Sequence, residues 1–574
     1  LHRVDRRQRQ MCIRDRDKLA EKIVLSATKI KKPTMEALDV LKRNFLRINK
    51  DTKDIPKKSD LLAVYHKLLK NGKIKQNKTL EKLLTKRAVR TLSGVSIITV
   101  LTKPYHCPGK CIYCPNEKVM PKSYIADEPA AARALQLNFD PYEQICRRLE
   151  ALQKNGHPTD KIELIVKGGT WNAYPVNYQY WFILRCFEAA NNSSKLQVTS
   201  NKLKIEEIKK ILIKEQEKNE KAKHRIIGLT LETRPDFINE KTIWQMREQG
   251  CTRVELGAQT IDNKILKLIK RGHTADTIKK AMRLLKLYGF KVDLHLMPQL
   301  PDSTPTKDLK MLKEIFENPD YRPDMIKIYP CTVVKNSELY NWFNKGKYKP
   351  YSDKKLLETL ITFKTFVPRY VRISRLIRDI PSHHIQAGNK MTNLRQVIQV
   401  EMAKRGLKCN CLRCREIGHQ PAVILNNSEG SLNAKDISSN KLQGILRSTQ
   451  NDKPKLFIDK YEASGGTEYF LSFEDTKRNI VFAFCRLRLD KNGLFPAFIR
   501  ELHTYGQALE INTKNHQEVQ HRGLGKQLIA AAEKICKNNH IDTLAVISGV
   551  GVKRYYKKLG FVENKTYLVK KLNK

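Results

Sequence analysis

Short apolar runs separated by longer helical stretches dominate the chain between residues 95 and 330. The runs are Val95–Thr99, Ile162–Val166, Ile226–Leu231, Val254–Gly257, Val292–Met297 and Met325–Tyr329. From the third run onward, successive runs begin about 28 to 38 residues apart, which leaves room for a crossover helix between parallel strands. The pattern predicts repeated βα units, and therefore an α/β fold with a parallel sheet that closes wholly or partly into a barrel. Six strands favour an incomplete, TIM-like barrel, with its chemistry at the C-terminal ends of the strands.

A different pattern precedes the barrel. Between residues 17 and 90, apolar residues recur at helical spacing, and Pro33 and Pro56 are placed to begin new helices. The same stretch contains 21 Lys or Arg and only 8 Asp or Glu. The basic residues greatly outnumber the acidic ones, so most of them cannot form ion pairs along a solvated helix face. We therefore favour a role for this segment in contacting phosphates. We therefore expect a basic helical domain at residues 17–94.

The C-terminal part of the chain has a third pattern. Strands are expected at Glu468–Phe473, Ile480–Leu487 and Phe498–Tyr505, followed by a helix, a strand and a further helix. Because the strands come first and adjacent in sequence, this order predicts an α+β domain at residues 455–574.

Composition sets the remaining boundaries. The barrel is expected at 95–382, a bridging segment at 383–425 and a polar linker or exposed loop at 426–454. Residues 1–16, LHRVDRRQRQMCIRDR, resemble translated sequencing-adapter read-through. We set them apart, together with Cys12, as a non-native tail; a genuine basic tail is the alternative.

The net charge indicates what kind of partner this protein binds, and the clustering of its cysteines indicates metal sites. The 574 residues include 109 Lys or Arg against 59 Asp or Glu, a net charge of +50, which favours a polyanionic partner. The sequence has no run of 18 apolar residues, no secretory signal and no lipid motif, so nucleic acid is favoured over a membrane and the cytoplasm is the expected location. The 13 cysteines are clustered, which in a reducing compartment indicates metal sites.

Three cysteines follow the first predicted strand. Cys107, Cys111 and Cys114 form a CxxxCxxC run, one thiolate short of the four that usually hold an iron–sulfur cube. A cube held by three thiolates keeps one iron open for a substrate, whereas a structural zinc site lacking its fourth ligand is the alternative. The spacing resembles the 4Fe–4S cluster loop of radical S-adenosylmethionine (SAM) enzymes, in which the open iron chelates the methionine part of SAM.

A pair of glycines ends the second predicted strand. The run is Lys167, Gly168, Gly169 and Thr170. Two glycines let a backbone approach a ligand closely, although an ordinary strand-to-helix turn is the alternative. The run resembles the glycine motif of radical SAM enzymes, which binds the methionine amino group. Lys167 stands where an apolar residue is expected, and we place it among the candidate catalytic residues without assigning it a role.

Polar side chains end the third and fourth predicted strands. Glu232 and Arg234 follow the third strand and Gln259 follows the fourth, while Arg271 and His273 add cationic and imidazole groups further along. At the mouth of a barrel these groups could hold the ribose and carboxylate of a cofactor, and we take Glu232 and Gln259 as cofactor-binding candidates. For each residue, anchoring a loop is the structural alternative.

A second cysteine group lies in the bridging segment. Cys409, Cys411 and Cys414 form a CxCxxC run, which favours a closed structural Zn²⁺ site. A second iron–sulfur cluster and unliganded thiols are the alternatives. The candidates for the fourth ligand are His419, His383, His384 and Cys331.

A glycine-containing turn precedes an amphipathic helix in the C-terminal domain. The turn consists of Gln520, His521, Arg522, Gly523, Leu524 and Gly525. Free N–H groups at such a helix N-terminus form a site for a pyrophosphate. This order of elements resembles GNAT acetyltransferases, which bind acetyl-CoA at the turn. The resemblance implies that Tyr555 or Tyr556 lies near the thioester, where a phenol could donate a proton to the leaving thiolate, and one of the two is expected to pack in the core.

The motifs together resemble one family. With the strings SYIADEPAAARALQLNFDPYEQ, KGGT, LTLETRPD, RELHTYG and HRGLGKQLI, the chain from about residue 20 onward is similar to the catalytic subunit of Elongator in its single-subunit microbial form. The resemblance implies an enzyme that makes 5-carboxymethyluridine at the wobble position of tRNA from acetyl-CoA. The basic helices and the barrel face would hold the anticodon stem-loop, in a monomer or a homodimer.

The implied reaction explains the need for a radical cofactor. C5 of uridine is too weak a nucleophile to take an acetyl carbon directly, and activating a strong methyl C–H bond is beyond acid–base side chains. The mechanism expected from the resemblance is hydrogen abstraction from the acetyl methyl by a 5′-deoxyadenosyl radical, addition of the carbon radical to C5, and thioester hydrolysis. A protein lysine acetyltransferase with a structural cysteine cluster is the alternative, and a non-enzymatic tRNA-binding scaffold is a third reading.

Overall fold

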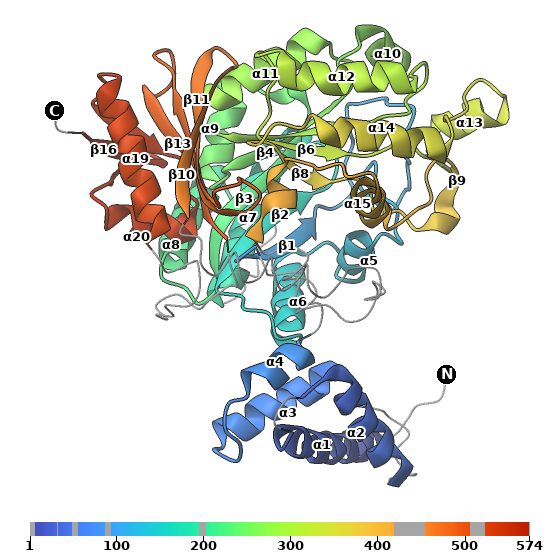
Figure 1. Ribbon diagram of the computed structural model, residues 1–574. Helices are drawn as coiled ribbons and strands as arrows, with labels where there is room; N and C mark the ends of the chain where they lie inside the picture. The colour runs from blue at the N-terminus through green and yellow to red at the C-terminus, as the bar shows by residue number, and fades with distance from the viewer. Residues whose placement is uncertain are drawn as a thin grey trace.

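Seven parallel strands form the central sheet of the molecule, which we describe from a computed structural model (Figure 1). In order across the sheet, the strands are β1 (Ser96–Leu101), β2 (Lys161–Lys167), β3 (Arg225–Thr233), β4 (Arg253–Gln259), β5 (Lys291–Leu296), β6 (Met325–Ile328) and β8 (Arg372–Arg375). Every neighbouring pair is parallel, and β1 and β8 are the two edges. The prediction of an α/β fold with an incomplete parallel barrel is confirmed.

The description covers seven segments of the chain. These are residues 6–30, 33–48, 56–85, 93–193, 203–417, 454–505 and 523–572, with residues 6–15, 78 and 82 described by their backbone alone. The expected polar linker at 426–454 therefore lies outside the described residues except for its last position. Among the helices described, none has the length and apolar character needed to cross a membrane.

β8 is a seventh barrel strand that the sequence did not reveal. Its four residues, Arg-Ile-Ser-Arg, contain a single apolar side chain, Ile373, so no apolar run marks the strand. β8 pairs in parallel with β6 and brings polar side chains to the inner face of the sheet. The six predicted strands are all present.

Helices cover the outer face of the barrel sheet (Figure 1). The main ones are α6 (Pro141–Lys154), α7 (Val176–Asn191), α8 (Ile205–Asn219), α9 (Glu240–Glu248), α11 (Ala275–Leu287), α12 (Pro305–Glu317) and α14 (Asp353–Thr365). Five of them begin where a side chain accepts the first free N–H groups, at Asp140, Asn239, Thr274, Thr304 and Ser352. Their apolar faces and the strands form one large core.

Shorter elements surround the ends of the barrel strands. They are α5 (Pro129–Gln136), α10 (Asn263–Leu268), β7 (Val333–Val334), α13 (Glu338–Asn344), the 3₁₀ turn η4 (Ser382–His384), β9 (Ile385–Ala387), α15 (Leu394–Lys404) and α16 (Leu412–Arg415). β7 and β9 pair as a small antiparallel ribbon.

The N-terminal part is helical, as the spacing predicts. It consists of α1 (Arg6–Thr28), α2 (Met35–Ile48), α3 (Lys58–Lys70) and α4 (Lys78–Leu84), which lie below α6 in Figure 1. Its core is formed by apolar residues at helical spacing, among them Ile23, Leu38, Leu61, Tyr65 and Leu68. The backbone of α1 includes residues 6–16, which the sequence analysis had set apart, while residues 1–5 lie outside the described part.

The C-terminal domain has its own seven-stranded sheet. The strands are β10 (Lys455–Ala463), β11 (Gly466–Glu474), β12 (Val481–Leu489), β13 (Ala497–Thr504), β14 (Thr543–Val546), β16 (Tyr567–Lys571) and β15 (Val562–Asn564), in that spatial order, with helices α19 (Leu524–Asn538) and α20 (Lys553–Lys557). Among the described strands of this sheet, β13 and β14 are the parallel neighbours; they pair at residues 498–499 and 545–546 and diverge beyond that point. The predicted α+β character is confirmed.

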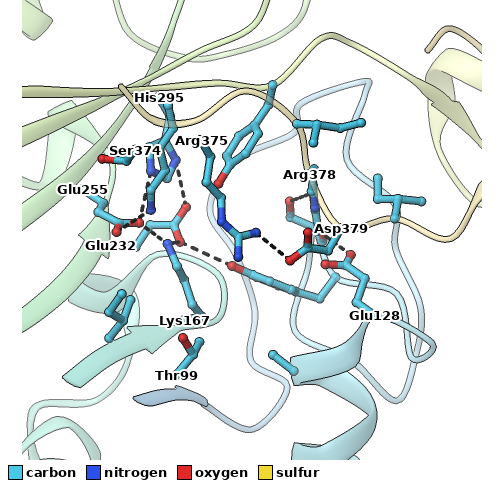
Figure 2. A pocket seen from close by; sticks show the side chains of 18 of the residues that line it. Thr99, Glu128, Lys167, Glu232, Glu255, His295, Ser374, Arg375, Arg378 and Asp379 are labelled. Carbon is cyan, nitrogen blue, oxygen red and sulfur yellow. Dashed lines mark hydrogen bonds and ion pairs between the residues drawn. The ribbon is translucent and has the colours of Figure 1, made fainter. Parts of the chain in front are cut away.

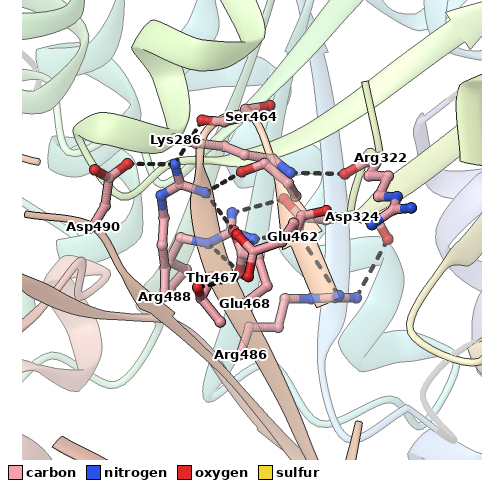
Figure 3. Close-up of polar contacts among 12 residues, drawn as sticks. Lys286, Arg322, Asp324, Glu462, Ser464, Thr467, Glu468, Arg486, Arg488 and Asp490 are labelled. Carbon is pink, nitrogen blue, oxygen red and sulfur yellow. Dashed lines mark hydrogen bonds and ion pairs between the residues drawn. The ribbon is translucent and has the colours of Figure 1, made fainter. Parts of the chain in front are cut away.

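Buried ion pairs join this domain to the barrel (Figure 3). Arg500 Nη1 donates to Asp324 Oδ2 at 2.8 Å and to Phe290 O at 2.8 Å, and Arg486 Nη2 donates to Tyr370 O at 2.8 Å. Asp324, Phe290 and Tyr370 lie directly or two residues before β6, β5 and β8. The C-terminal sheet therefore sits at the starts of the barrel strands, opposite the strand ends.

Candidate active site

All seven barrel strands contribute side chains to a cavity of about 790 Å³ on the inner face of the sheet (Figure 2). The lining runs from strand starts to strand ends and includes Thr99, Lys167, Glu232, Glu255, His295, Lys327 and Ser374, one from each strand. Because the strands are parallel, these side chains converge on one space.

Side chains from several strands form a buried network of opposite charges in the cavity (Figure 2). Lys167 Nζ lies 2.9 Å from Glu232 Oε2 and also pairs with Glu255. His295 bridges the same two carboxylates, with Nδ1 3.3 Å from Glu232 and Nε2 3.1 Å from Glu255. Lys327 Nζ lies 2.5 Å from the other oxygen of Glu255. One acidic pair is thus held by three basic groups.

Electrostatics keep both carboxylates ionised. Burial is the largest single influence and opposes their charge, but Lys167 and His295, joined at Glu255 by Lys327, together lower the pKa of Glu232 and Glu255 below the ordinary value. Burial also disfavours charge on Lys167, but the two carboxylates hold its pKa well above the ordinary value. Burial lowers the pKa of Lys327 to about 8. Glu232, Glu255 and His295 have the spacing of metal ligands, but the two lysine ammonium groups already supply the cation there.

The cysteine loop follows β1, as predicted, and is held from several sides. Cys107 Sγ lies 3.8 Å from Thr170 Oγ1, and Arg271 Nη1 donates to Cys111 Sγ at 3.3 Å. A hydrogen bond from Cys114, and then Arg271 acting against burial, lower the pKa of Cys111 to about 4. The three sulfurs do not gather within 4.8 Å of one another, unlike the second cysteine group.

The glycine motif lies against the start of the cysteine loop. Gly168 and Gly169 have φ values of 125° and 23°, in the region that favours glycine. A Cβ at Gly168 would overlap Thr102 Oγ1, which belongs to the segment leaving β1. The two predicted motifs are therefore brought together, with Thr170 as the contact to Cys107.

The other strand-end residues divide between the cavity and the loops. Glu232 and Gln259 line the cavity, and Gln259 has a positive φ of 73°. Arg234 instead anchors loops, since its Nη2 donates to Asp236 at 2.8 Å and to Arg271 O at 2.7 Å. Arg234 therefore fits the structural alternative of anchoring a loop, whereas Glu232 and Gln259 border the cavity, where their predicted contact with a cofactor stays a prediction.

Several lining residues were missed by the sequence analysis. Tyr124 donates its hydroxyl to Glu232 at 3.3 Å, and the guanidinium of Arg378 lies 5.0 Å from the Tyr124 ring centre. Arg375 and Tyr329 also face the cavity. Tyr124 lies within the string SYIADEP, which was used only for the family resemblance, and Arg375 belongs to the unpredicted strand β8.

The second cysteine group gathers at the start of α16. The sulfurs of Cys409, Cys411 and Cys414 all lie within 4.8 Å of one another, and Lys364 Nζ donates to Cys414 Sγ at 3.5 Å. None of the candidate fourth ligands that the structure describes joins them. His383 and His384 contact Asp127, and Cys331 is buried in a different apolar cluster, while His419 lies outside the described residues.

The predicted anion-binding turn is described only at its end. Gln520, His521 and Arg522 lie outside the described residues, whereas Gly523 precedes α19 with a φ of 75° and Leu524 and Gly525 begin the helix. A Cβ on Gly525 would lie 2.9 Å from the Tyr555 hydroxyl oxygen. Tyr556 is instead buried in the core of the domain. Tyr555 therefore faces the turn and Tyr556 packs.

Comparison with known proteins gives the family. The radical SAM superfamily model matches residues 101–312, the Radical_SAM C-terminal domain matches 323–404 and the acetyltransferase (GNAT) domain matches 516–571. A tRNA uridine(34) acetyltransferase of Methanocaldococcus jannaschii is 42% identical over 572 residues, covering 96% of this chain and 97% of that protein. Human Elongator complex protein 3 is 33% identical over 86% of this chain and 87% of its own length. The chain belongs to the Elongator complex protein 3 family.

A solved structure of the Elongator complex protein 3 family supports the same assignment. The archaeal Methanocaldococcus infernus Elp3 with an N-terminal deletion has a TM-score of 0.67 and 41% identity, covering 84% of this chain and all of that one. The predicted family, fold class and enzyme class are thus confirmed: the chain combines a radical SAM domain with an acyltransferase domain.

The described residues of this Elongator complex protein 3 family member fit a cluster and SAM. The thiolates of Cys107, Cys111 and Cys114 would each bind a different iron of a cube and leave the fourth iron open for SAM. Arg271 directs positive charge at these sulfurs, as an anionic cluster requires. Gly168 and Gly169 place backbone without side chains in the turn whose Thr170 contacts Cys107.

Proposed function

We propose that this protein forms 5-carboxymethyluridine at the wobble position of tRNA from acetyl-CoA, acting in the cytoplasm as a monomer or homodimer. The observation that supports it is a single chain with two sites: a three-cysteine loop beside a charged barrel cavity, and an acetyl-CoA-type turn facing Tyr555. Relatives 40–43% identical over 85–96% of this chain are named tRNA uridine(34) acetyltransferases, and tRNA is the substrate that accounts for the net charge of +50.

We assign the holding of the cluster to Cys107, Cys111 and Cys114, and the holding of SAM to the Gly168–Thr170 turn with Glu232 and Gln259. When bound, the two supply a carbon-centred radical able to take hydrogen from the acetyl methyl group. Lys167 fixes Glu232 and Glu255 in place through its two ion pairs. The cavity walls position the reactants and exclude water.

At the second site, Tyr555 is the proposed proton donor to the thiolate of CoA. Its hydroxyl lies against Gly525 at the first turn of α19, where Gln520 to Gly525 would hold the pyrophosphate. Near this point β13 and β14 diverge, so that beyond residues 499 and 546 their backbone groups are not paired with each other and could contact a thioester.

We also assign Zn²⁺ to Cys409, Cys411 and Cys414. Their sulfurs lie within the span of a single ion, and the site ties α16 to the segment after α15. Elemental analysis of the wild type and of Cys409→Ser should differ by one zinc per chain. An unchanged zinc content in that variant would contradict the assignment.

The function is tested by anaerobic incubation of the reconstituted protein with tRNA, SAM and acetyl-CoA labelled in the methyl group. Nucleoside mass spectrometry should show a labelled carboxymethyl group at the wobble uridine. The triple variant of Cys107, Cys111 and Cys114 to Ala should lose the product entirely, while Cys146→Ala, a half-buried cysteine on α6, should keep it. If the triple variant still transfers acetyl groups to lysine peptides and wild type makes no modified uridine, the lysine acetyltransferase reading replaces ours.

A further inference from the structure

A third group of potential metal ligands lies outside both cysteine sites. Asp127 Oδ2 lies 2.8 Å from His384 Nε2 and 3.6 Å from His383 Nε2, and the three ligand atoms all lie within 4.8 Å of one another. Asp127 and His384 are 257 positions apart in sequence, and the ring centres of His383 and His384 lie 4.3 Å apart. Their nitrogen atoms converge on one carboxylate oxygen from a single turn, η4.

This group differs from the other two in its surroundings. The carboxylates of the barrel network are neutralised by Lys167 and Lys327, and the second cysteine group has Lys364 beside it. Within the segments that the structure describes, the basic side chains paired with Asp127 are the two histidines alone. Two imidazoles and one carboxylate converging on one point are a ligand set that suits a divalent transition-metal ion.

The group joins two segments that border the active-site cavity. Segment 123–128 carries Asp127, and segment 377–387 carries both histidines; each lines the cavity through neighbouring residues. Arg378 donates to Glu128 at 2.7 Å between them, as Figure 2 shows, and Ile125 packs against Ile380 and Ile385 below. The ligand group is the outermost contact of this junction, since Asp127 and His383 are exposed.

We propose that Asp127, His383 and His384 bind one divalent transition-metal ion of the Zn²⁺ class, which fastens segment 123–128 to segment 377–387 at the rim of the cavity. Zinc–ligand bonds of about 2.0–2.1 Å place tetrahedral ligands about 3.4 Å apart. The observed separations of 2.8 and 3.6 Å lie on either side of that value, so small side-chain rotations accommodate the ion. The fourth position faces solvent and takes water. The proposal is independent of the reaction assigned above.

The test is an anaerobic titration of the full chain, with its two cysteine sites already loaded, with Co²⁺. Its visible spectrum distinguishes nitrogen and oxygen ligands from thiolates. One further equivalent should bind without thiolate charge-transfer bands, and Asp127→Asn, His383→Ala and His384→Ala should each weaken it about 10-fold or more. His66→Ala is the matched control, because His66 pairs with one carboxylate, Glu81, at 3.1 Å without a second histidine.

Hydrogen exchange tests the fastening. Zn²⁺ should slow amide exchange in both segments of the wild type and in neither segment of Asp127→Asn, with far-UV circular dichroism showing that the variant is folded. Absence of the further equivalent, or an equivalent unchanged in the Asp127 and histidine variants, overturns the site. Metal binding that leaves exchange in both segments unchanged overturns the fastening.

Discussion

Gly168 shows how much a single residue constrains the backbone of the proposed SAM site. Its φ of 125° disfavours any side chain, and a Cβ would overlap Thr102 Oγ1. We expect Gly168→Ala to lower SAM affinity at least about 10-fold, because backbone that must move away from Thr102 also moves away from the ligand. Equilibrium dialysis with labelled SAM measures this. Gly346→Ala is the control, since Gly346 has a φ of 68° but open space around it; an equal loss in both variants would contradict the explanation.

The two adjacent tyrosines of α20 should have separable roles. Tyr555→Phe removes the hydroxyl that faces Gly525, so we expect CoA release to fall about 10²- to 10⁴-fold, the usual effect of losing a general acid. Tyr556→Phe changes a ring buried in the domain core and should alter the rate less than about 10-fold. Thiol release during tRNA modification is the measurement. Equal effects in the two variants would remove Tyr555 from the mechanism.

At the scale of the strands, Lys167 links β2 to β3 and β4. Lys167→Met leaves Glu232 and Glu255 with fewer cations, and breaking a buried ion pair in this way costs about 3–5 kcal/mol of stability. The double variant Lys167→Met with Glu232→Gln should recover part of that loss, because it also removes one of the stranded charges. Calorimetric melting of the two variants and of Glu232→Gln measures the coupling. Strictly additive effects would show that the network does not act as a unit.

The elements that the sequence predicted share a strong local signal. The six barrel strands are apolar runs between helices, and Cys107, Cys111 and Cys114 have a spacing that is informative by itself. β8 was missed because Ile373 is its single apolar residue. Without that strand in the prediction, Arg375 was not recognised as a residue that lines the cavity. The role of Lys167 could not be read from its neighbours, since its partners come from strands 65 and 88 residues away.

At the scale of the whole molecule, ion pairs where the two sheets meet make the stability of the protein depend on pH. Burial raises the pKa of Glu501, but Lys291 and Arg486 outweigh it and lower the pKa to about 2. The ionised Glu501 carboxylate therefore stabilises the folded protein fully above its ordinary pKa of 4.5, and this stabilisation is lost as the pH falls toward 2. A pKa shift of this size contributes about 3 kcal/mol to the free energy of unfolding. Glu501→Gln should lower the melting temperature at pH 7 and flatten its fall below pH 4.5.

Glu358 supplies the control for that experiment. It pairs with Arg405 at 2.7 Å, but both side chains are exposed, and solvent screens such a pair so that it contributes little to stability. Glu358→Gln should therefore leave the melting temperature and its acid dependence close to wild type. A similar response in both variants would show that burial at the junction is not the cause.

The placement of the C-terminal sheet against the strand starts has a consequence for any attempt to rebuild this enzyme from parts. Arg486 and Arg500 find their partners on the other domain, before β5, β6 and β8. If the gene were divided between residues 417 and 454, the two fragments would have to be expressed in the same cell, because each fragment would expose the surface that binds the other. A foreign acyltransferase could replace this one only if grafted together with matching guanidinium groups.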